Sequence, residues 1–188
     1  MATSTVSRFR SASGFTCATL VTFALISLAG CNRSRTAADL SSEPAEIPYG
    51  TKIDFGQGGN SELYKVAGWS KTEEKFTWSE GTSAELRIPV PATNDAISLK
   101  MRLAALTKAP ELPFQPVEIY VNDQKIAEWQ ITETGEFVAS IPHNLTKPGG
   151  GLTIVIKTPK ATSPKALGLS ADPRVLGICC LDLELFKG

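Results

Sequence analysis

The chain has 188 residues, which is enough for one domain of ordinary size with a buried core. The 19 basic side chains (Lys and Arg) balance 19 acidic ones, so the formal net charge is zero. Nucleic-acid binding needs a basic patch or stripe that neutralises phosphates, and this composition therefore predicts no nucleic-acid partner.

The first 30 residues have the composition of a targeting segment. Arg8 and Arg10 give it a positively charged start, and residues 15–28 form a 14-residue apolar stretch. That stretch is too short to span a bilayer comfortably. We therefore expect residues 1–30 to be a signal peptide that the mature protein lacks.

The apolar stretch ends in Leu28-Ala29-Gly30-Cys31. These four residues resemble the lipobox of bacterial lipoproteins, and the resemblance implies cleavage before Cys31 and diacylglycerol on its thiol. The alternative is a plain secretory signal followed by a chance cysteine. Asn32 comes next, which in the family's sorting rule favours the outer membrane. The expected location is therefore the periplasmic face of the outer membrane, with attachment through lipid.

The residues after the lipobox change character at about residue 50. Residues 31–50 are polar, contain proline and show no apolar periodicity, so we expect a flexible tether there. The folded domain is then expected to cover residues 51–188.

From residue 52 onward the apolar residues alternate with polar ones, which is typical of half-buried β-strands. The runs are separated by Pro, Gly, Asn and Asp turns and cover residues 52–56, 76–79, 84–90, 96–106, 117–121, 126–131, 136–141, 152–157 and 176–186. Eight or nine antiparallel strands in a single sheet would leave one face exposed, so two packed sheets are expected. The pattern predicts an all-β sandwich of jelly-roll type. The alternative is an immunoglobulin-like sandwich, which usually needs fewer strands.

The last strand, at residues 176–186, is the longest uninterrupted β-like run. A strand that closes a chain usually inserts between strands already formed, so we expect it at the centre of a sheet. It contains the adjacent pair Cys179-Cys180, whose side chains point to opposite faces of a regular strand and cannot easily form a disulfide. In phase with Leu183 and Leu185, Cys179 is expected to face the core and Cys180 the exterior. The alternative is a bulge that lets the two sulfurs bond.

No catalytic or metal-binding pattern stands out. The single histidine, His143, follows a proline at a strand exit, and no serine has the surroundings of a nucleophile elbow. Carboxylates for glycoside hydrolysis could be drawn from Glu73, Glu74 and Asp172, but no spacing singles out a pair. The loop at residues 56–61 lacks the third glycine and the following helix of a dinucleotide-binding loop. We therefore predict a non-catalytic protein with no cofactor or metal.

The three tryptophans, Trp69, Trp78 and Trp129, are the large side chains with a binding role to consider. Aromatic faces can stack on the apolar side of sugar rings, whereas in most sandwiches tryptophans fill the core between the sheets. Trp69 is the best candidate for an exposed position because it lies between strand-like runs, followed closely by Glu73. The candidate ligand-binding residues are Trp69, Glu73, Trp78 and Arg174.

Several short motifs together resemble the β-sandwich module at the C-terminus of some bacterial membrane glycosyltransferases and phosphoglycerol-transferase-like proteins of envelope polysaccharide synthesis. The motifs are Ile53-Asp54-Phe55-Gly56, Gly68-Trp69-Ser70, Trp78, the hairpin at Val121-Asn122, Ser163-Pro164 and residues 172–178. The resemblance covers residues 51–187 and implies a jelly-roll, carbohydrate-binding-like accessory role without catalytic residues. In contrast to those fusions, we expect no transferase part within these 188 residues.

Asp172 and Arg174 lie two positions apart at the entrance of the last strand, so a carboxylate–guanidinium pair is feasible. Such a pair either clamps the strand, with Asp172, Arg174, Cys179 and Cys180 all structural, or contacts a sugar. Taken together, the sequence predicts a lipid-anchored envelope protein with a glycan-binding accessory role. The alternative is a scaffold lipoprotein that docks an envelope protein partner.

Overall fold

The computed structural model describes residues 45–188. The predicted signal peptide, the lipidation site at Cys31 and most of the predicted tether lie outside these residues. None of the helices among the described residues is long and apolar enough to cross a membrane.

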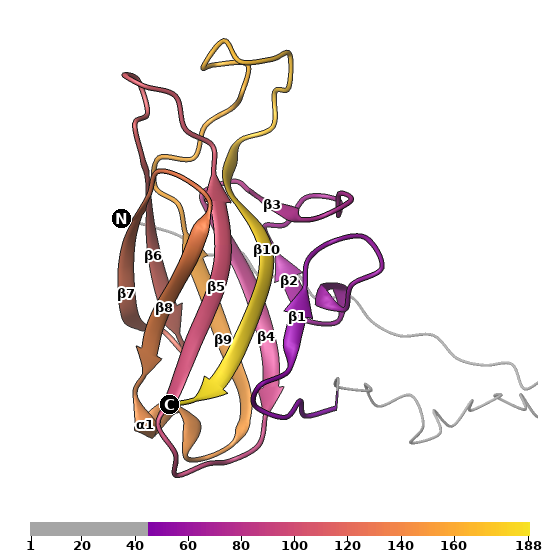
Figure 1. Ribbon diagram of the computed structural model, residues 1–188, viewed down its shortest axis with the longest axis vertical. Helices are drawn as coiled ribbons and strands as arrows, with labels where there is room; N and C mark the ends of the chain where they lie inside the picture. Colours follow the sequence, from indigo (N-terminus) through magenta and orange to yellow (C-terminus); the bar gives the residue numbers. More distant parts are fainter. Residues whose placement is uncertain (1–44) are drawn as a thin grey trace, which may run out of the picture. The chain divides into compact units, whose positions relative to one another are not determined.

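The described chain forms two antiparallel sheets of five strands each (Figure 1). The first sheet contains β1 (Lys52–Asp54), β3 (Thr77–Glu80), β5 (Ile97–Ala105), β8 (Gly135–Ile141) and β10 (Leu176–Lys187). The second contains β2 (Lys65–Ala67), β4 (Ser83–Val90), β6 (Gln115–Val121), β7 (Gln124–Ile131) and β9 (Gly150–Lys157). A 3₁₀ turn, η2 (Ser61–Leu63), and a one-turn helix, α1 (His143–Thr146), complete the fold.

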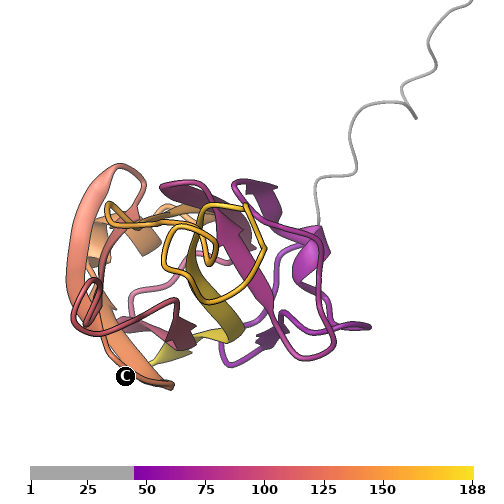
Figure 2. The same ribbon diagram turned by 90° about the horizontal axis from the view of Figure 1, so that it is seen from above.

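The path of the chain confirms the predicted jelly-roll sandwich. From β4 onward, consecutive strands lie in opposite sheets, except for the hairpin of β6 and β7. The chain therefore wraps around a single core instead of building one sheet after the other. In both views the loop between β9 and β10 lies over the end of the sandwich at which β10 begins (Figures 1 and 2).

The period-two pattern of the sequence places the core. Along β4, β5 and β6 every second side chain is buried, and the intervening polar residues face outward. The fully buried side chains of the two sheets meet between the layers and include Ile53, Phe55, Leu86, Ile88, Leu99, Met101, Leu103, Ile119, Ile131, Leu152 and Ile154. The Asn122-Asp123 turn joins β6 and β7 with positive φ at both residues, 46° and 65°, as a tight hairpin requires.

Strand β10 holds the centre of the first sheet, as predicted. It pairs with β5 along one side and with both β1 and β3 along the other. Because its two neighbours on the second side occupy different stretches of the strand, β10 supports three strands at once. The last strand of the chain therefore organises one whole layer of the sandwich.

The predicted orientation of the two cysteines was wrong. The register of β10 against β5 shifts between Cys180 and Asp182, and this bulge at Leu181 inverts the alternation of the preceding residues. Cys180 is fully buried within the core, whereas Cys179 is buried outside it. Both thiols are free, as expected for adjacent side chains on opposite faces of a strand.

The packed chain begins before the predicted boundary at residue 51. The N–H of Ile47 donates to the carbonyl of Pro89 (2.9 Å), and the N–H of Gly50 donates to that of Leu185 (2.7 Å). The side chains of Ile47 and Tyr49 pack against the core. Residues 47–50, which the sequence assigns to the tether, are thus part of the sandwich.

Candidate functional site

Strand β3 presents Trp78 on the outer face of the first sheet. Thr77 and Ser79 are buried, and because neighbouring side chains of a strand point to opposite faces, Trp78 points outward. It is half-buried, and its ring meets that of Phe76 edge-on at 5.9 Å. The strand therefore offers an aromatic pair at the surface.

Asp172 and Arg174 form the pair that their spacing predicts. The carboxylate accepts hydrogen bonds from Nε of Arg174 (3.0 and 3.1 Å) and from its Nη2 (2.6 Å). It also accepts one from the backbone N–H of Arg174 (2.9 Å), which closes the turn before β10. These bonds from Arg174 lower the pKa of Asp172 below its ordinary value, and Asp172 in turn raises the pKa of the guanidinium.

Glu73 joins this pair from a third segment. A tight turn, in which the N–H of Glu73 donates to the carbonyl of Phe76 (2.8 Å), places its carboxylate 3.8 Å from Nη2 of Arg174. Burial, and secondarily the charge of Glu73, raises the pKa of the Cys179 thiol to about 12. In the ladder between β10 and β3, Cys179 lies opposite Trp78.

These residues form one candidate site, which we call the β3 surface: Glu73, Phe76, Trp78, Asp172 and Arg174. The side chains of Glu73 and Arg174 are 41% and 36% exposed, so a bound molecule could reach both. The structure thus brings three of the four predicted ligand-binding residues, Glu73, Trp78 and Arg174, into one area.

The backbone of Trp69 runs beside β3, but its side chain points to the opposite face from that of Trp78. Trp69 pairs with Ser79 across an isolated bridge and shares the inward direction of this buried residue. Its ring contacts Phe55 at 5.1 Å between ring centroids, and its Nε1 donates to the carbonyl of Glu85 (2.9 Å). Half-buried against the core, Trp69 faces away from Trp78. Trp129 is likewise half-buried and pairs with Phe137 at 5.5 Å.

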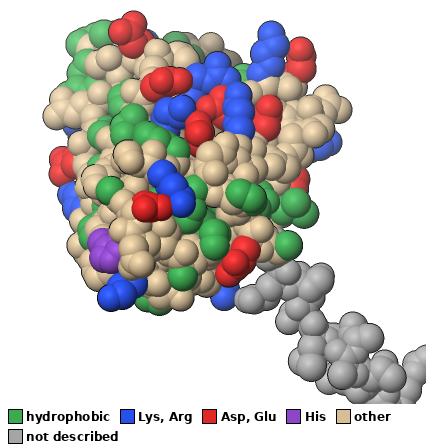
Figure 3. Space-filling view, turned by 60° about the horizontal axis from the view of Figure 1, so that its bottom comes forward, with side chains coloured by type: hydrophobic (Ala, Val, Ile, Leu, Met, Phe, Trp, Pro, Cys, Tyr) green, Lys and Arg blue, Asp and Glu red, His purple; other side chains and the backbone are tan. Residues whose placement is uncertain are grey.

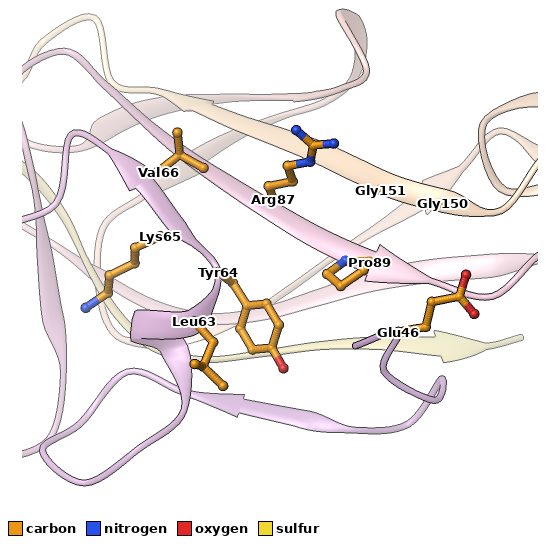
Figure 4. A pocket seen from close by; sticks show the side chains of 9 residues that line it. All are labelled: Glu46, Leu63, Tyr64, Lys65, Val66, Arg87, Pro89, Gly150 and Gly151. Atoms are coloured by element: carbon orange, nitrogen blue, oxygen red, sulfur yellow. The ribbon is translucent and has the colours of Figure 1, made fainter. Parts of the chain in front are cut away.

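A hollow of about 310 Å³, which sequence reasoning missed, lies along β2, β4 and β9 (Figure 4). Leu63, Tyr64, Val66 and Pro89 supply apolar walls, and Arg87 and Glu46 lie at its margin. Leu63 and Val66 are 63% and 55% exposed, the largest values among the large apolar side chains of the described residues. The one feature of the sequence that could have indicated this hollow is the presence of two apolar residues, Leu63 and Val66, in a short segment without the alternation of a strand.

Lys65, which lies beside this hollow, forms hydrogen bonds with the neighbouring segments instead of contributing its amine to the hollow. Figure 4 shows the amine of Lys65 turned away from the hollow. It donates to Glu62 (2.8 Å), Thr72 (2.9 Å) and Thr77 (2.9 Å), and Thr77 in turn donates to the carbonyl of Phe55. Lys65 therefore fixes the edge strand β2 to β3 and to the loop before it.

Among the described residues, no three His, Cys, Asp or Glu side chains are grouped as metal ligands would be. On the face seen in Figure 3, basic and acidic side chains lie interspersed. His143 is exposed in α1.

No protein-family model and no curated protein sequence matches this chain. Among solved structures, it is similar to a family 6 carbohydrate-binding module at 7% identity, covering 77% of this chain and 99% of that one with a TM-score of 0.45. It is also similar to a family 36 module of a multidomain xylanase from the hindgut metagenome of Trinervitermes trinervoides (10% identity, 73% and 97% covered, TM-score 0.42). A third is the C-terminal family 6 module of a marine laminarinase from Zobellia galactanivorans (9% identity, 73% and 98% covered, TM-score 0.42). The resemblance to modules of membrane glycosyltransferases stays a prediction.

Proposed function

We propose that this protein is a lipid-anchored envelope protein whose sandwich binds a glycan through the β3 surface without catalysis. The observation that carries the proposal is the position of a partly exposed aromatic strand beside fixed polar groups of both kinds. Trp78 offers a ring face for the apolar side of a sugar. Glu73 and Asp172 accept hydrogen bonds, and Arg174 donates them.

The rigidity of the polar groups supports the same proposal. The guanidinium of Arg174 is held through Nε, through Nη2 and through the backbone turn, so little freedom is left to lose when a ligand binds. Binding sites work best when the contacting groups are fixed before the ligand arrives. The sequence left two alternatives for the Asp172–Arg174 pair, a structural clamp of the last strand or a contact with a sugar. Arg174 could serve in both roles.

The binding test compares two tryptophans that lie on different parts of the sandwich. We expect Trp78→Ala to weaken binding to the recognised glycan about tenfold on an array of envelope and plant polysaccharides, because a stacked aromatic ring contributes about 1.4 kcal/mol. Trp129→Ala removes the same side chain far from the β3 surface and serves as the matched control. Trp69→Phe tests the remaining candidate from the sequence and is expected to bind like the parent chain. The absence of any glycan whose retention depends on Trp78 would refute the proposal.

The proposed location in the cell envelope is supported by the sequence alone. Leu28-Ala29-Gly30-Cys31 supports lipidation at Cys31, and Asn32 supports the outer membrane. Two or three acyl chains give stable anchoring, because each buried CH₂ contributes about 0.8 kcal/mol. In this setting, the resemblance to transferase-linked modules supports an accessory role in handling envelope polysaccharide.

A second candidate function, docking of an envelope protein partner, is favoured by the hollow beside β2. Exposed apolar side chains that lie together are typical of interaction sites, and Leu63 and Val66 are such a pair. Cross-linking in whole cells is the test. One protein captured stoichiometrically by the parent chain, and lost with Leu63→Ser/Val66→Ser but not with Trp78→Ala, would favour docking over glycan binding.

A further inference from the structure

We propose that the β3 surface selects uncharged glycans and rejects those built from uronic acids. This inference rests on the proposed function and specifies the ligand class of the same surface. It follows from how the cation of that surface, Arg174, is already occupied.

Arg174 is the residue that an acidic sugar would seek, because a guanidinium matches a carboxylate in charge and shape. Its Nε and Nη2 are engaged by Asp172 at 2.6 to 3.1 Å, and Nη2 lies 3.8 Å from an oxygen of Glu73. The positive charge is therefore compensated within the protein before any ligand binds.

The charges around Arg174 exceed what one guanidinium can balance. Asp172, Glu73 and, more weakly, Glu80 all act on it, as the raised pKa of Arg174 reflects. A sugar carboxylate placed beside Trp78 would bring a further negative charge among these groups, and like charges at such distances repel. The local field thus disfavours a uronate.

An uncharged sugar meets no such penalty. Each hydroxyl both donates and accepts, so it can donate to Glu73 and accept from Arg174 without disturbing the ion pair. The partial exposure of both side chains leaves lone pairs of Glu73 and N–H groups of Arg174 accessible to a ligand. Binding of this kind is expected to be nearly independent of salt, because no net charge is exchanged.

The experiment uses paired oligosaccharides that differ only at C6, where one member has a hydroxymethyl group and the other a carboxylate. Pairs of gluco, galacto and manno configuration are titrated into a lipid-free chain that begins at Asn32, directly after the lipidated cysteine, at low and high salt. We expect the uncharged member of the recognised pair to bind at least about tenfold more tightly, with little change across the salt range.

Charge-removing variants of the surface give the sharper readout. In Glu73→Gln the guanidinium loses one of its charged partners, while the amide oxygen can still accept a hydroxyl hydrogen bond. The ratio of uronate affinity to uncharged-sugar affinity is therefore expected to rise about fivefold, whatever the change in either affinity alone. Asp172→Asn is expected to act in the same direction. Glu128→Gln, an exposed carboxylate of β7 in the other sheet, is the matched control and should leave both affinities unchanged.

The outcomes distinguish a failure of the proposed selectivity from a failure of the proposed glycan binding. If the uronate binds as tightly as its uncharged partner in the parent chain, or if Glu73→Gln leaves the ratio of the two affinities unchanged, the selectivity is wrong while glycan binding stands. A uronate bound through the exposed Lys71 or Lys75 of the preceding loop would appear as strong salt dependence and would overturn the selectivity as well. If no pair shows binding that depends on Trp78, the proposed function itself fails and the inference falls with it.

Discussion

Gln115 illustrates how a single buried side chain can cost stability. It lies in the inward row of β6, fully buried, and neither its Oε1 nor its Nε2 has a hydrogen-bond partner among the described residues. An unsatisfied buried polar group costs about 1–3 kcal/mol. We expect Gln115→Met, which has nearly the same shape, to raise the free energy of unfolding by about 1 kcal/mol.

Urea denaturation of the mature chain measures this difference. Gln130→Met, on the exposed side of β7, is the control and should change stability little. A loss of stability in Gln115→Met would contradict the prediction and would show that the amide is satisfied in solution, most simply by a buried water.

The two thiols predict how stability depends on alkaline pH. Burial raises the pKa of Cys179 to about 12 and that of Cys180 well above its ordinary value of 9.0. The folded chain therefore keeps both protons at a pH where the unfolded chain has lost them. Stability is full below the unfolded pKa and falls as the pH rises through 9 toward 12. Thermal unfolding between pH 7 and 11 should show this decline, and Cys179→Ala/Cys180→Ala should show a shallower one. Equal slopes in the two chains would contradict it.

For single residues, the sequence predicted which charged side chains pair more reliably than it predicted the direction in which an aromatic side chain points. The spacing of Asp172 and Arg174 indicated an ion pair, and the pair forms, although a turn before β10 and not an extended strand brings the two side chains together. The arrival of Glu73 was out of reach, because it depends on how a loop remote in sequence folds back. The direction of Trp69 also depends on tertiary pairing, since its bridge to Ser79 sets which way the ring points.

Among the elements, the end of β2 contains a glycine that no other residue can replace cheaply. Gly68 has a φ of +73°, and a Cβ there would overlap the carbonyl oxygen of Ser83. Gly58 has a similar φ of +80°, but a Cβ there meets open space. We expect Gly58→Ala to cost about 1 kcal/mol, from backbone strain alone. Gly68→Ala should cost about 3 kcal/mol or more, because the backbone must also move.

Chemical denaturation of the two alanine variants tests this difference directly. The pair is well matched, because both substitutions add one methyl group at positive φ. Equal losses of stability would mean that the contact of Gly68 with the neighbouring strand β4 is not a constraint in solution.

Strand β10 shows where element-level prediction succeeds and where it stops. Its place as the strand that closes the chain indicated a central position, and its pairing with β1, β3 and β5 confirms this. The bulge at Leu181 left no signal in the alternation, because Cys179, Cys180 and Leu181 are all apolar enough for either face. Strand β2 was missed for a related reason, since three residues with a register shift are too short to show a period.

At the scale of the whole molecule, the fold follows from a simple constraint. Two sheets with one apolar face each can bury those faces only against each other, so period-two segments separated by turns specify a sandwich. The choice between jelly-roll and immunoglobulin-like order is set by which strands cross between the sheets, as β4 to β5 and β9 to β10 do here. Strand number was the only guide to that choice in the sequence.

Membrane attachment and folding should be separable properties of this chain. Among the described residues, the core and the β3 surface are built from side chains that follow the lipobox, so we expect the sandwich to fold without Cys31. We expect Cys31→Ser, expressed with its own signal in a bacterial host, to leave the detergent-extracted membrane fraction and to incorporate no labelled palmitate. Its thermal unfolding midpoint, measured on the secreted domain, should match that of the parent chain. Cys179→Ala is the matched control, because it removes a buried thiol and should leave the chain in the membrane fraction. Continued membrane retention of Cys31→Ser from which the signal peptide has been cleaved, as mass spectrometry of its N-terminus would show, would contradict lipid anchoring.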